Sequence, residues 1–500
     1  MNATILGMIK NNVLYQDNSF MPNRNIIVFG GPGSYKTQSV VITNVFSETE
    51  NGIVVTDTKG EVYEKTVAVK KMQGYKVYVV NFDDMRHSNR YNPFDYIITD
   101  TDAATVADKI VESANRDAKK DVWYYSQRSL LKALILYVMY ESLPEDRNLR
   151  GLTRFLQSYS TAKNKKSGKS ELDEQFEKLD FSHPARRNYE LGFKQTQGET
   201  QASVIFSLLT SLGDFVDDVV GEFTSFSDFD LADIGKEKII LYLKIPALKR
   251  TYESLINLFI SQLFIALYDL GDSNHAHLPN NVNFILDEFP SLGKFAQYEE
   301  FLATCRGYGI GVITICQSLT QLQDRYGRDK AESILGNNAV KMCLNASNAT
   351  TAKYFSEQLG KATVKVDTGS TSYSRSTTES RSVSDSYNYT SRSLMNPDEI
   401  EKMPPNESII VFSNGSPAKV NKAFQFKLFP GAESIRVANQ REYIGKPDKK
   451  QLEKMEQKTN AFMTKTEAQV QQLQSTADIL AELAELNPGE VVSGAEDDFN

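Results

Sequence analysis

The chain has 500 residues and a formal net charge of −8, and 40% of its residues are hydrophobic while 24% are charged. These values are typical of a globular protein of about two to three domains, and they argue against a nucleic-acid binder whose whole surface is basic, though not against a local basic channel. Three cysteines, Cys305, Cys316 and Cys343, lack the spacing of a metal or redox site, which indicates buried thiols in a reducing compartment.

The first motif reads as a strand, a glycine-rich loop and the start of a helix. The apolar run from Ile26 breaks at Gly30, and Lys36 and Thr37 precede an apolar-periodic segment. The spacing fits the pattern G-x-x-x-x-G-K-[ST], in which backbone N–H groups surround phosphates, the lysine binds the β- and γ-phosphates and the hydroxyl binds Mg²⁺. The alternative is a glycine-rich turn without a ligand. The residues expected to bind nucleotide are Gly30, Gly31, Gly33, Ser34, Tyr35, Lys36 and Thr37.

Tyr35 departs from this pattern, because it stands where the second glycine is expected. A side chain at this position must point away from the phosphates, and the freedom of glycine to adopt a positive φ angle is lost. We still expect nucleotide binding, and the departure raises the question of how fast the loop supports hydrolysis.

Strands and helices alternate in the following part of the chain. Gly52–Thr56 and Lys76–Asn81 read as strands, and the helical stretch between them ends near Met72. This alternation is typical of βαβ units and a parallel sheet. Asp57 and Lys59 follow the first of these strands at its carboxyl end, where ligands of open α/β sheets bind.

Helical periodicity dominates between residues 99 and 235, for example in Gln127–Tyr140 and Gln201–Phe215. We therefore predict an all-α domain inserted into a nucleotide-binding α/β domain. That domain would consist of residues 1–98 and 236–445.

Strand patterns return after the helical region. They cover Lys238–Ile245, Asn281–Glu288 and Gly311–Gln317, and weaker runs follow at Val340–Leu344 and Ser408–Phe412. These runs would complete the sheet of the nucleotide-binding domain.

Two carboxylates, Asp287 and Glu288, end one of these strands. Beside a phosphate loop, such a pair supplies an aspartate that holds Mg²⁺ together with Thr37 and a glutamate that positions the attacking water. Gln317 ends another strand and would reach the same edge of the sheet. The alternative for the acidic pair alone is a solvated turn.

Arg306 is a candidate for stabilising the charge of a transferred phosphoryl group, because glycine-flanked backbone holds it in Thr304–Gly309. It would act in its own subunit or in a neighbouring one. The alternative is a structural ion pair.

The most apolar segment is Ser254–Tyr268, and no secretory signal is visible at the N-terminus. The segment carries no charge, but it contains Asn257, Ser261 and Gln262 and is shorter than the roughly 18 residues of a membrane span. We expect a buried helix there and no transmembrane segment in this chain.

Three polar segments carry weaker signals. Lys163–Lys169 is basic and is better explained by a solvated loop than by phosphate contact. Thr368–Ser393 is serine-rich with interleaved tyrosines and arginines, which suits single-stranded DNA bound to a mobile segment as well as a polar loop without a ligand. In the tail 446–500, Lys449–Leu486 has an amphipathic helical pattern, and the acidic end Glu496–Asn500 is expected to be disordered.

A set of short boxes, taken together with the acidic pair, resembles the TraG-type type IV secretion coupling proteins. The boxes follow the order expected of that family from about residue 25 to 425 and comprise Asp57–Glu61, Tyr91–Phe94, Leu286–Lys294, Cys305–Ile310, Cys316–Ser318, Gln321–Leu322 and Ser393–Ile400. The resemblance implies a RecA-like P-loop NTPase domain with an inserted all-α domain. It also implies ATP and Mg²⁺ as cofactors and assembly into a hexamer.

The resemblance further assigns roles and partners. It implies that Lys36 and Thr37 hold nucleotide and Mg²⁺, that Asp287 and Glu288 hold the metal and the hydrolytic water, and that Gln317 senses the γ-phosphate. The implied partners are single-stranded DNA, a relaxase with accessory DNA-processing proteins, and the ATPases and membrane proteins of a secretion channel. Family members usually begin with membrane helices, so the resemblance implies a cytoplasmic location at the inner face of the cell membrane, with an anchor that is removed or separate.

We therefore expect an ATP-hydrolysing coupling protein that delivers relaxase-bound single-stranded DNA to a type IV secretion channel during conjugation. One alternative is a related ring translocase or secretion-channel ATPase, which the boxes Asp57–Glu61 and Tyr91–Phe94 and the helical insert disfavour. An alternative of another class is a docking adaptor that binds nucleotide but hardly hydrolyses it, and Tyr35 motivates that alternative.

Overall fold

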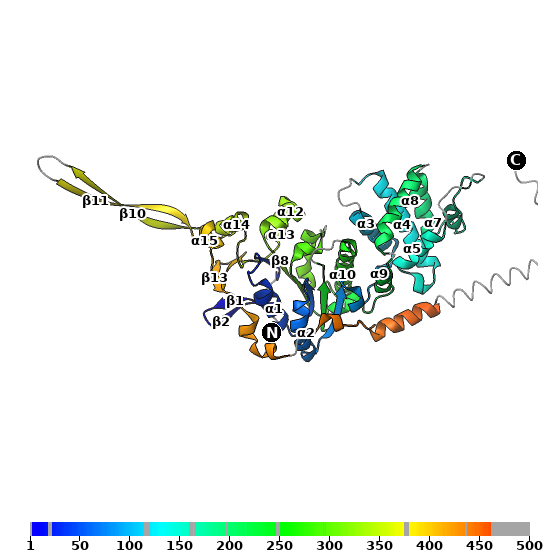
Figure 1. Ribbon diagram of the computed structural model, residues 1–500, viewed down its shortest axis with the longest axis horizontal. Coiled ribbons are helices and arrows are strands. Elements are labelled where there is room, and N and C mark those ends of the chain that lie inside the picture. Colours follow the sequence, from blue (N-terminus) through cyan, green and yellow to red (C-terminus); the bar gives the residue numbers. More distant parts are fainter. Residues whose placement is uncertain are drawn as a thin grey trace, which may run out of the picture. The chain divides into compact units, whose positions relative to one another are not determined.

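The structure is a computed structural model that describes residues 3–18, 23–114, 120–159, 164, 167–196, 199–215, 217–246, 251–293, 295, 297–374, 380–435 and 438–461 (Figure 1). The chain divides into two compact units. Unit 1 contains Met1–Pro93, Asp108–Ala118 and Asp230–Gly445, and unit 2 contains Phe94–Ala107, Lys119–Phe229 and Lys446–Asn500.

Unit 1 is built on an 11-stranded sheet. Its strands from β9 to β5 are parallel, and the strands from β12 to β2 are antiparallel. In spatial order the strands are β2 (Asn12–Asp17), β1 (Ala3–Ile9), β13 (Ala418–Asn421), β12 (Glu407–Phe412), β9 (Val340–Cys343), β3 (Ile26–Phe29), β8 (Ile310–Cys316), β7 (Val282–Leu286), β4 (Gly52–Asp57), β6 (Ile239–Lys244) and β5 (Lys76–Asn81). The pattern of the sequence predicted the parallel strands and β12, but not β1, β2 and β13.

The central strands are apolar throughout because helices cover both faces of the sheet. Successive strand residues point to opposite faces, and on β7 Ile285 joins the core that contains α1 and α2, whereas Phe284 packs against Phe264 of α10 at 5.1 Å between ring centroids. The helices of unit 1 are a π-helical turn (Thr37–Val41) that leads into α1 (Ile42–Ser47), then α2 (Glu61–Met72), α10 (Glu253–Ser273), α11 (Tyr298–Thr304), α12 (Leu319–Tyr326), α13 (Arg328–Gly336), α14 (Ala349–Leu359), α15 (Pro397–Glu401) and α16 (Gln425–Leu428).

Helix α10 contains the most apolar segment of the sequence. Among the described residues it is the one helix that is long and apolar enough to cross a membrane, and 67% of its apolar window is buried inside the fold. The expected buried helix is therefore confirmed.

The register of the sheet brings three distant chain segments to one edge. In β3 and β8, Phe29 pairs with Cys316, and in β7 and β8, Leu286 pairs with Thr314. Because these strands are parallel, the residues that follow Phe29, Leu286 and Cys316 meet at the carboxyl edge.

A two-stranded antiparallel ribbon contains residues 368–374 and 380–393, for which the sequence suggested either a mobile DNA-binding segment or a polar loop, and not strands. Strands β10 (Lys361–Ser374) and β11 (Ser380–Ser393) pair with each other from Lys361–Ser393 to Ser374–Ser380. Figure 1 shows this ribbon as two long arrows that extend away from α14 and α15. Serine richness hid the strands, because the threonine, valine and tyrosine residues that favour them are spread between serines.

Unit 2 is helical in its described residues. Helix α4 is its central element, with Leu130, Leu131 and Leu134 fully buried, and Phe176 of α6 stacks on Tyr189 of α7 at 4.1 Å between ring centroids. The unit supports our proposal that an all-α domain is inserted at about residues 99–235. Its helices are the first part of α3 (Asp100–Ala114), then α4 (Val122–Glu141), α5 (Leu149–Ser158), α6 (Glu171–Glu177), α7 (Pro184–Leu191), α8 (Glu199–Leu212), α9 (Asp218–Phe223) and a helix at 449–461.

Two of the polar segments fall wholly or partly outside the described residues. The tail beyond residue 461, with its expected helix to Leu486 and its acidic end, is one, and Lys163, Lys165 and Lys166 of the basic segment Lys163–Lys169 are the other.

Candidate nucleotide-binding site

The glycine-rich loop connects β3 to the π-helical turn and lies at the carboxyl edge of the sheet. The Gly30 N–H donates to the carbonyl of Cys316 at 3.1 Å, which ties the loop to β8. The Lys36 ammonium donates to the carbonyls of Gly30 at 2.7 Å and Gly31 at 3.1 Å. Burial lowers the pKa of Lys36, while the nearby Asp287 and Glu288 act in the opposite direction.

Close packing explains the glycines of the loop. A Cβ atom on Gly31 would lie 2.7 Å from the Cβ of Ser347, and a Cβ on Gly30 would lie 2.5 Å from the Ser34 hydroxyl. Gly33 has a φ of +74°, which side chains rarely adopt. The buried Ser34 hydroxyl has no hydrogen-bond partner among the described residues, as fits a loop that surrounds a ligand.

Tyr35 keeps the backbone conformation that a glycine would supply. Its φ is +63°, in the left-handed region, and its side chain is 49% exposed. The ring meets Phe424 edge-on at 5.5 Å between centroids. Lys422 lies beside both, since its ammonium donates to the Ser34 carbonyl at 3.0 Å and sits 6.0 Å from the Tyr35 ring. The contacts with Phe424 and Lys422 therefore support a tyrosine in a strained, left-handed backbone conformation.

The Thr37 hydroxyl and the Asp287 carboxylate meet at this edge. Thr37 Oγ1 donates to Asp287 Oδ2 at 3.2 Å, and the Glu288 N–H donates to Asp287 Oδ1 at 3.0 Å. Burial, and then the neighbouring Glu288, raises the pKa of Asp287 to about 6, against the opposing effects of Lys36 and Thr37. A hydroxyl and a buried carboxylate are hard oxygen ligands of the kind that Mg²⁺ takes together with substrate phosphates, so the residues fit this ion.

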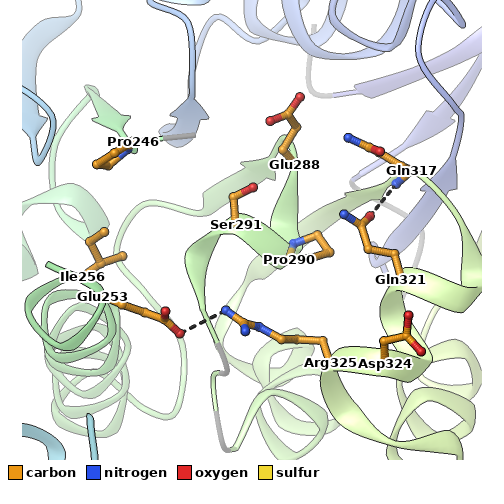
Figure 2. A pocket seen from close by; sticks show the side chains of 10 residues that line it. All are labelled: Pro246, Glu253, Ile256, Glu288, Pro290, Ser291, Gln317, Gln321, Asp324 and Arg325. Carbon is orange, nitrogen blue, oxygen red and sulfur yellow. Dashed lines mark hydrogen bonds and ion pairs between the residues drawn. The ribbon is translucent and has the colours of Figure 1, made fainter. Parts of the chain in front are cut away.

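Glu288 and Gln317 line one cavity next to the loop. Figure 2 shows the cavity, which has a volume of about 540 Å³ and contains Ser291 and Gln321 as well. Glu288 has a φ of 49°, so the backbone turns sharply after Asp287. The Gln317 N–H donates to Gln321 Oε1 at 3.1 Å. The arrangement provides a carboxylate and an amide close to the Thr37–Asp287 pair, whose oxygen atoms fit a metal ion.

Arg306 lies at the opposite edge of the sheet. It belongs to a 3₁₀ turn, Cys305–Tyr308, that precedes β8, whereas the loop contacts the end of β8 at Cys316. The seven residues of β8 span about 20 Å at roughly 3.3 Å per residue. The exposed Arg306 is therefore not brought to the site of its own chain.

Asp57, which the sequence placed at the ligand edge, has a local role. Its carboxylate accepts N–H donors of Gly60 at 2.7 Å and Tyr63 at 2.9 Å, and so holds the turn into α2. Burial raises the pKa of Asp57.

Sequence reasoning missed the ion pair between Glu253 and Arg325, at 3.0 Å, on the wall of the cavity. It also missed Lys422 and Phe424 beside the loop. Nothing in their local sequence marks these residues, because only the packing of distant segments gives them a function.

Comparison with known proteins agrees with this geometry. Residues 3–473 match the family described as "Type IV secretory system Conjugative DNA transfer". Among curated relatives, the conjugal transfer protein TraG of Escherichia coli is 27% identical over 402 residues, which cover 76% of this chain and 62% of the relative. The protein VirD4 of Rhizobium radiobacter is 24% identical over 387 residues, covering 75% of this chain and 53% of that protein. The chain thus spans somewhat more than half the length of these relatives.

Solved structures show the same fold. The bacterial conjugative coupling protein TrwBdeltaN70 superposes with a TM-score of 0.60 at 18% identity, over 87% of this chain and 90% of that one. A structure of TrwB in complex with ADP and Mg²⁺ superposes with a TM-score of 0.58 at 18% identity, over 86% and 90% of the two chains. The predicted RecA-like fold with an all-α domain is confirmed, and the chain belongs to the conjugative DNA transfer family of type IV secretory systems.

Proposed function

We propose that this chain is the ATP-hydrolysing part of a conjugative coupling protein, which recruits relaxase-bound single-stranded DNA and delivers it to a type IV secretion channel. The observation that carries the proposal is the contact between Thr37 and Asp287, with Glu288 on the adjacent cavity wall. The complexes of the TrwB neighbour with ADP and Mg²⁺ and with an ATP analogue support ATP and Mg²⁺ as the cofactors here.

The residues of the site suit metal-assisted hydrolysis. Lys36 would bind the β- and γ-phosphates, while Thr37 and Asp287 would hold Mg²⁺, which neutralises the charge that develops on the phosphates. Glu288 would accept a proton from the water that attacks the γ-phosphorus as the bond to the leaving ADP oxygen breaks, and Gln317 would contact the γ-phosphate. Catalysis of this kind depends on positioning and charge neutralisation rather than on a covalent intermediate.

Assembly with other copies of the chain is part of the proposal. Because Arg306 is exposed and lies at the far edge of the sheet, it fits a role across a subunit boundary better than a role in its own site. We therefore propose a hexamer at the inner face of the cell membrane, where the channel ATPases and membrane proteins are its partners.

The ribbon supports the recruitment of DNA. Residues that pair directly in an antiparallel ladder share a face, and the pairs Lys365–Tyr389 and Asp367–Tyr387 place two tyrosines, a lysine and an aspartate on one face near the base of the ribbon, where Lys365 also forms an ion pair with Asp367 at 3.2 Å. Tyr387 and Tyr389 are 63% and 65% exposed, and the Lys365 ammonium lies 4.5 Å from the Tyr387 ring centroid. Exposed aromatic rings next to a cation suit stacking with the bases of single-stranded DNA.

A pair of matched variants tests the ribbon. We expect the double variant Tyr387→Ala, Tyr389→Ala to bind single-stranded DNA about tenfold more weakly or worse, because stacking contributes about 1–3 kcal/mol per base. The double variant Asn388→Ala, Thr390→Ala changes the other face and serves as the control. Affinities for single-stranded DNA are measured by fluorescence anisotropy at one salt concentration. If the tyrosine double variant binds as tightly as the wild type and the control variant, the ribbon is not part of the DNA site.

Hydrolysis measurements separate the proposal from its alternatives. ATP turnover is measured with and without single-stranded DNA for the wild type, Glu288→Gln and Tyr35→Gly, with Glu300→Gln as a control at an exposed site. We expect turnover in the wild type that DNA stimulates, and a loss of at least about 100-fold in Glu288→Gln. No turnover above the Glu288→Gln background would leave the docking adaptor as the better explanation. Turnover without any response to DNA would favour another ring or channel ATPase.

A further inference from the structure

A half-exposed aromatic cluster borders the phosphate loop on the side opposite to the catalytic cavity. Tyr35 and Phe426 are 49% and 39% exposed, and Phe424 lies between them. The Phe424 ring meets Tyr35 edge-on at 5.5 Å and stacks on Phe426 at 5.1 Å with an interplanar angle of 23°. We call these three residues the aromatic cluster.

The order of the strands places the cluster relative to the acids. From β3, which leads into the loop, the sheet continues through β8 to β7 on one side, where Asp287 and Glu288 follow β7. On the other side it continues through β9 and β12 to β13, and Phe424 and Phe426 follow β13. The loop therefore has carboxylates on one flank and aromatic rings on the other.

Hydrogen bonds fix the segment that carries the cluster to the loop and its helix. The ammonium of Lys422, which is 4% exposed, donates to the carbonyls of Ser34 at 3.0 Å and Pro405 at 2.7 Å. The Thr43 hydroxyl donates to the Ala423 carbonyl at 2.8 Å. These contacts make the cluster a preformed surface, which lowers the entropy lost when a ligand binds to it.

This arrangement gives the terminal phosphate and the base of a bound nucleotide different surroundings. With Thr37, Asp287 and Glu288 on one flank, the terminal phosphate of a bound nucleotide would lie toward the cavity. The base must then leave the loop on the other flank, where the exposed rings lie. We propose that Tyr35 and Phe426 form the stacking surface for the base of the nucleotide, so that the residue which departs from the loop pattern contributes to binding.

The amides next to the cluster limit how finely it can discriminate between bases. Gln425 Nε2 donates to Gln38 Oε1 at 3.1 Å, so these amide groups are directed toward each other. Stacking accepts any large aromatic base, whereas a choice between adenine and guanine needs hydrogen bonds to the base edge. The surface therefore favours purine over pyrimidine nucleotides and separates ATP from GTP only weakly.

The inference rests on the proposed function, since it assumes that the loop binds a nucleoside triphosphate. Binding is measured by calorimetry with Mg²⁺ and non-hydrolysable analogues of ATP, GTP and CTP, and with inorganic tripolyphosphate as a probe that lacks a base. The variants are Tyr35→Gly, Tyr35→Phe and Phe426→Ala. Tyr15→Ala on the edge strand β2, where the side chain is 48% exposed, is the control.

We expect Tyr35→Gly and Phe426→Ala to bind the ATP and GTP analogues on the order of tenfold more weakly, because one stacked ring is lost. The affinity of Phe426→Ala for tripolyphosphate stays at the wild-type value, and Tyr15→Ala binds all probes like the wild type. Tyr35→Phe keeps the ring and therefore keeps the affinity for the ATP and GTP analogues. An equal loss for tripolyphosphate and the ATP analogue would overturn the inference, because the ring would then support the loop and not the base.

Two further outcomes separate the inference from the proposed function. If the wild type binds the analogues and both ring variants match it, the stacking surface is wrong while nucleotide binding stands. If the wild type binds none of the triphosphates, the proposed function fails and the stacking surface fails with it.

Discussion

We expect the buried carboxylate of Asp287 to lower the stability of the ligand-free fold near neutral pH, although the same carboxylate would be needed to bind the metal. One substitution tests this expectation. Burial and the neighbouring Glu288 raise the pKa of Asp287 from 3.8 to about 6. A carboxyl group with a raised pKa in the folded chain contributes stability that is fully present below pH 3.8 and is lost as the pH rises through about 6. Near neutral pH the ionised Asp287 thus destabilises the ligand-free fold, and Asp287→Asn removes that effect because the amide does not ionise.

The magnitude follows from the two pKa values. The shift from 3.8 to about 6 corresponds to about 3 kcal/mol over the whole titration. Between pH 5 and pH 8 the wild type loses about 1.4 kcal/mol of folding stability through the ionisation of Asp287. Asn can still accept the N–H of Glu288 and donate to the Thr37 hydroxyl, so the polar contacts keep partners. Relative to the wild type, Asp287→Asn should therefore gain about 1.4 kcal/mol between these pH values.

Calorimetric unfolding in EDTA at pH 5 and pH 8 measures this gain, which corresponds to about 1–2 °C in the midpoint for a chain of this size. Asp324→Asn, at an exposed carboxylate of the same cavity, is the matched control. At pH 8, Mg²⁺ with a non-hydrolysable ATP analogue should raise the midpoint of the wild type, and Asp287→Asn should lose most of that rise.

One result would refute this reasoning. If Asp287→Asn lowers the midpoint in EDTA by the same amount at pH 5 and pH 8, the carboxylate is held mainly by its contacts with Thr37 and the Glu288 N–H. Asp287 would then be a structural residue whose charge carries no penalty in the folded chain.

Three further substitutions test the packing around the site and in unit 2. Gly31→Ala places a Cβ atom 2.7 Å from that of Ser347, so we expect nucleotide affinity in calorimetry to fall by at least tenfold, and an unchanged affinity would contradict the loop packing. Tyr298→Phe removes a buried hydroxyl 2.6 Å from Thr314 Oγ1 and should destabilise unit 1 by about 1–3 kcal/mol in urea unfolding, which a neutral result would refute. Phe176→Ala removes a buried ring of unit 2 and should cost about 3–5 kcal/mol by the same measurement, and a loss below about 1 kcal/mol would show that the stack is not tightly packed.

The sequence alone was sufficient for the elements whose signals are local. The parallel strands are recognisable because both of their faces are buried, so they appear as continuous apolar runs such as Ile26–Phe29. The acidic pair Asp287–Glu288 is recognisable because it directly follows such a run, and Lys36 and Thr37 are recognisable because only a glycine-rich loop separates them from one. Since parallel strands end at the same edge, the meeting of Thr37 with Asp287 could also be expected before the structure was known.

Only the tertiary structure could decide how distant segments use these elements. In the sequence, Tyr35 only departs from the loop pattern. In the structure, Phe424 contacts its ring and Lys422 donates to the carbonyl of Ser34, although both residues lie almost four hundred positions away. Arg306 follows Asp287 by only 19 positions in the sequence. Strand β8 nevertheless crosses the sheet between Arg306 and Gln317 and so places the arginine at the far edge. The faces of the ribbon depend on the register between β10 and β11, which serine-rich strands specify weakly in their own sequence. Local sequence patterns therefore indicate the chemistry of the site. Its orientation and the contacts that support it depend on packing between remote segments, because such contacts produce no periodic pattern in the sequence of either segment.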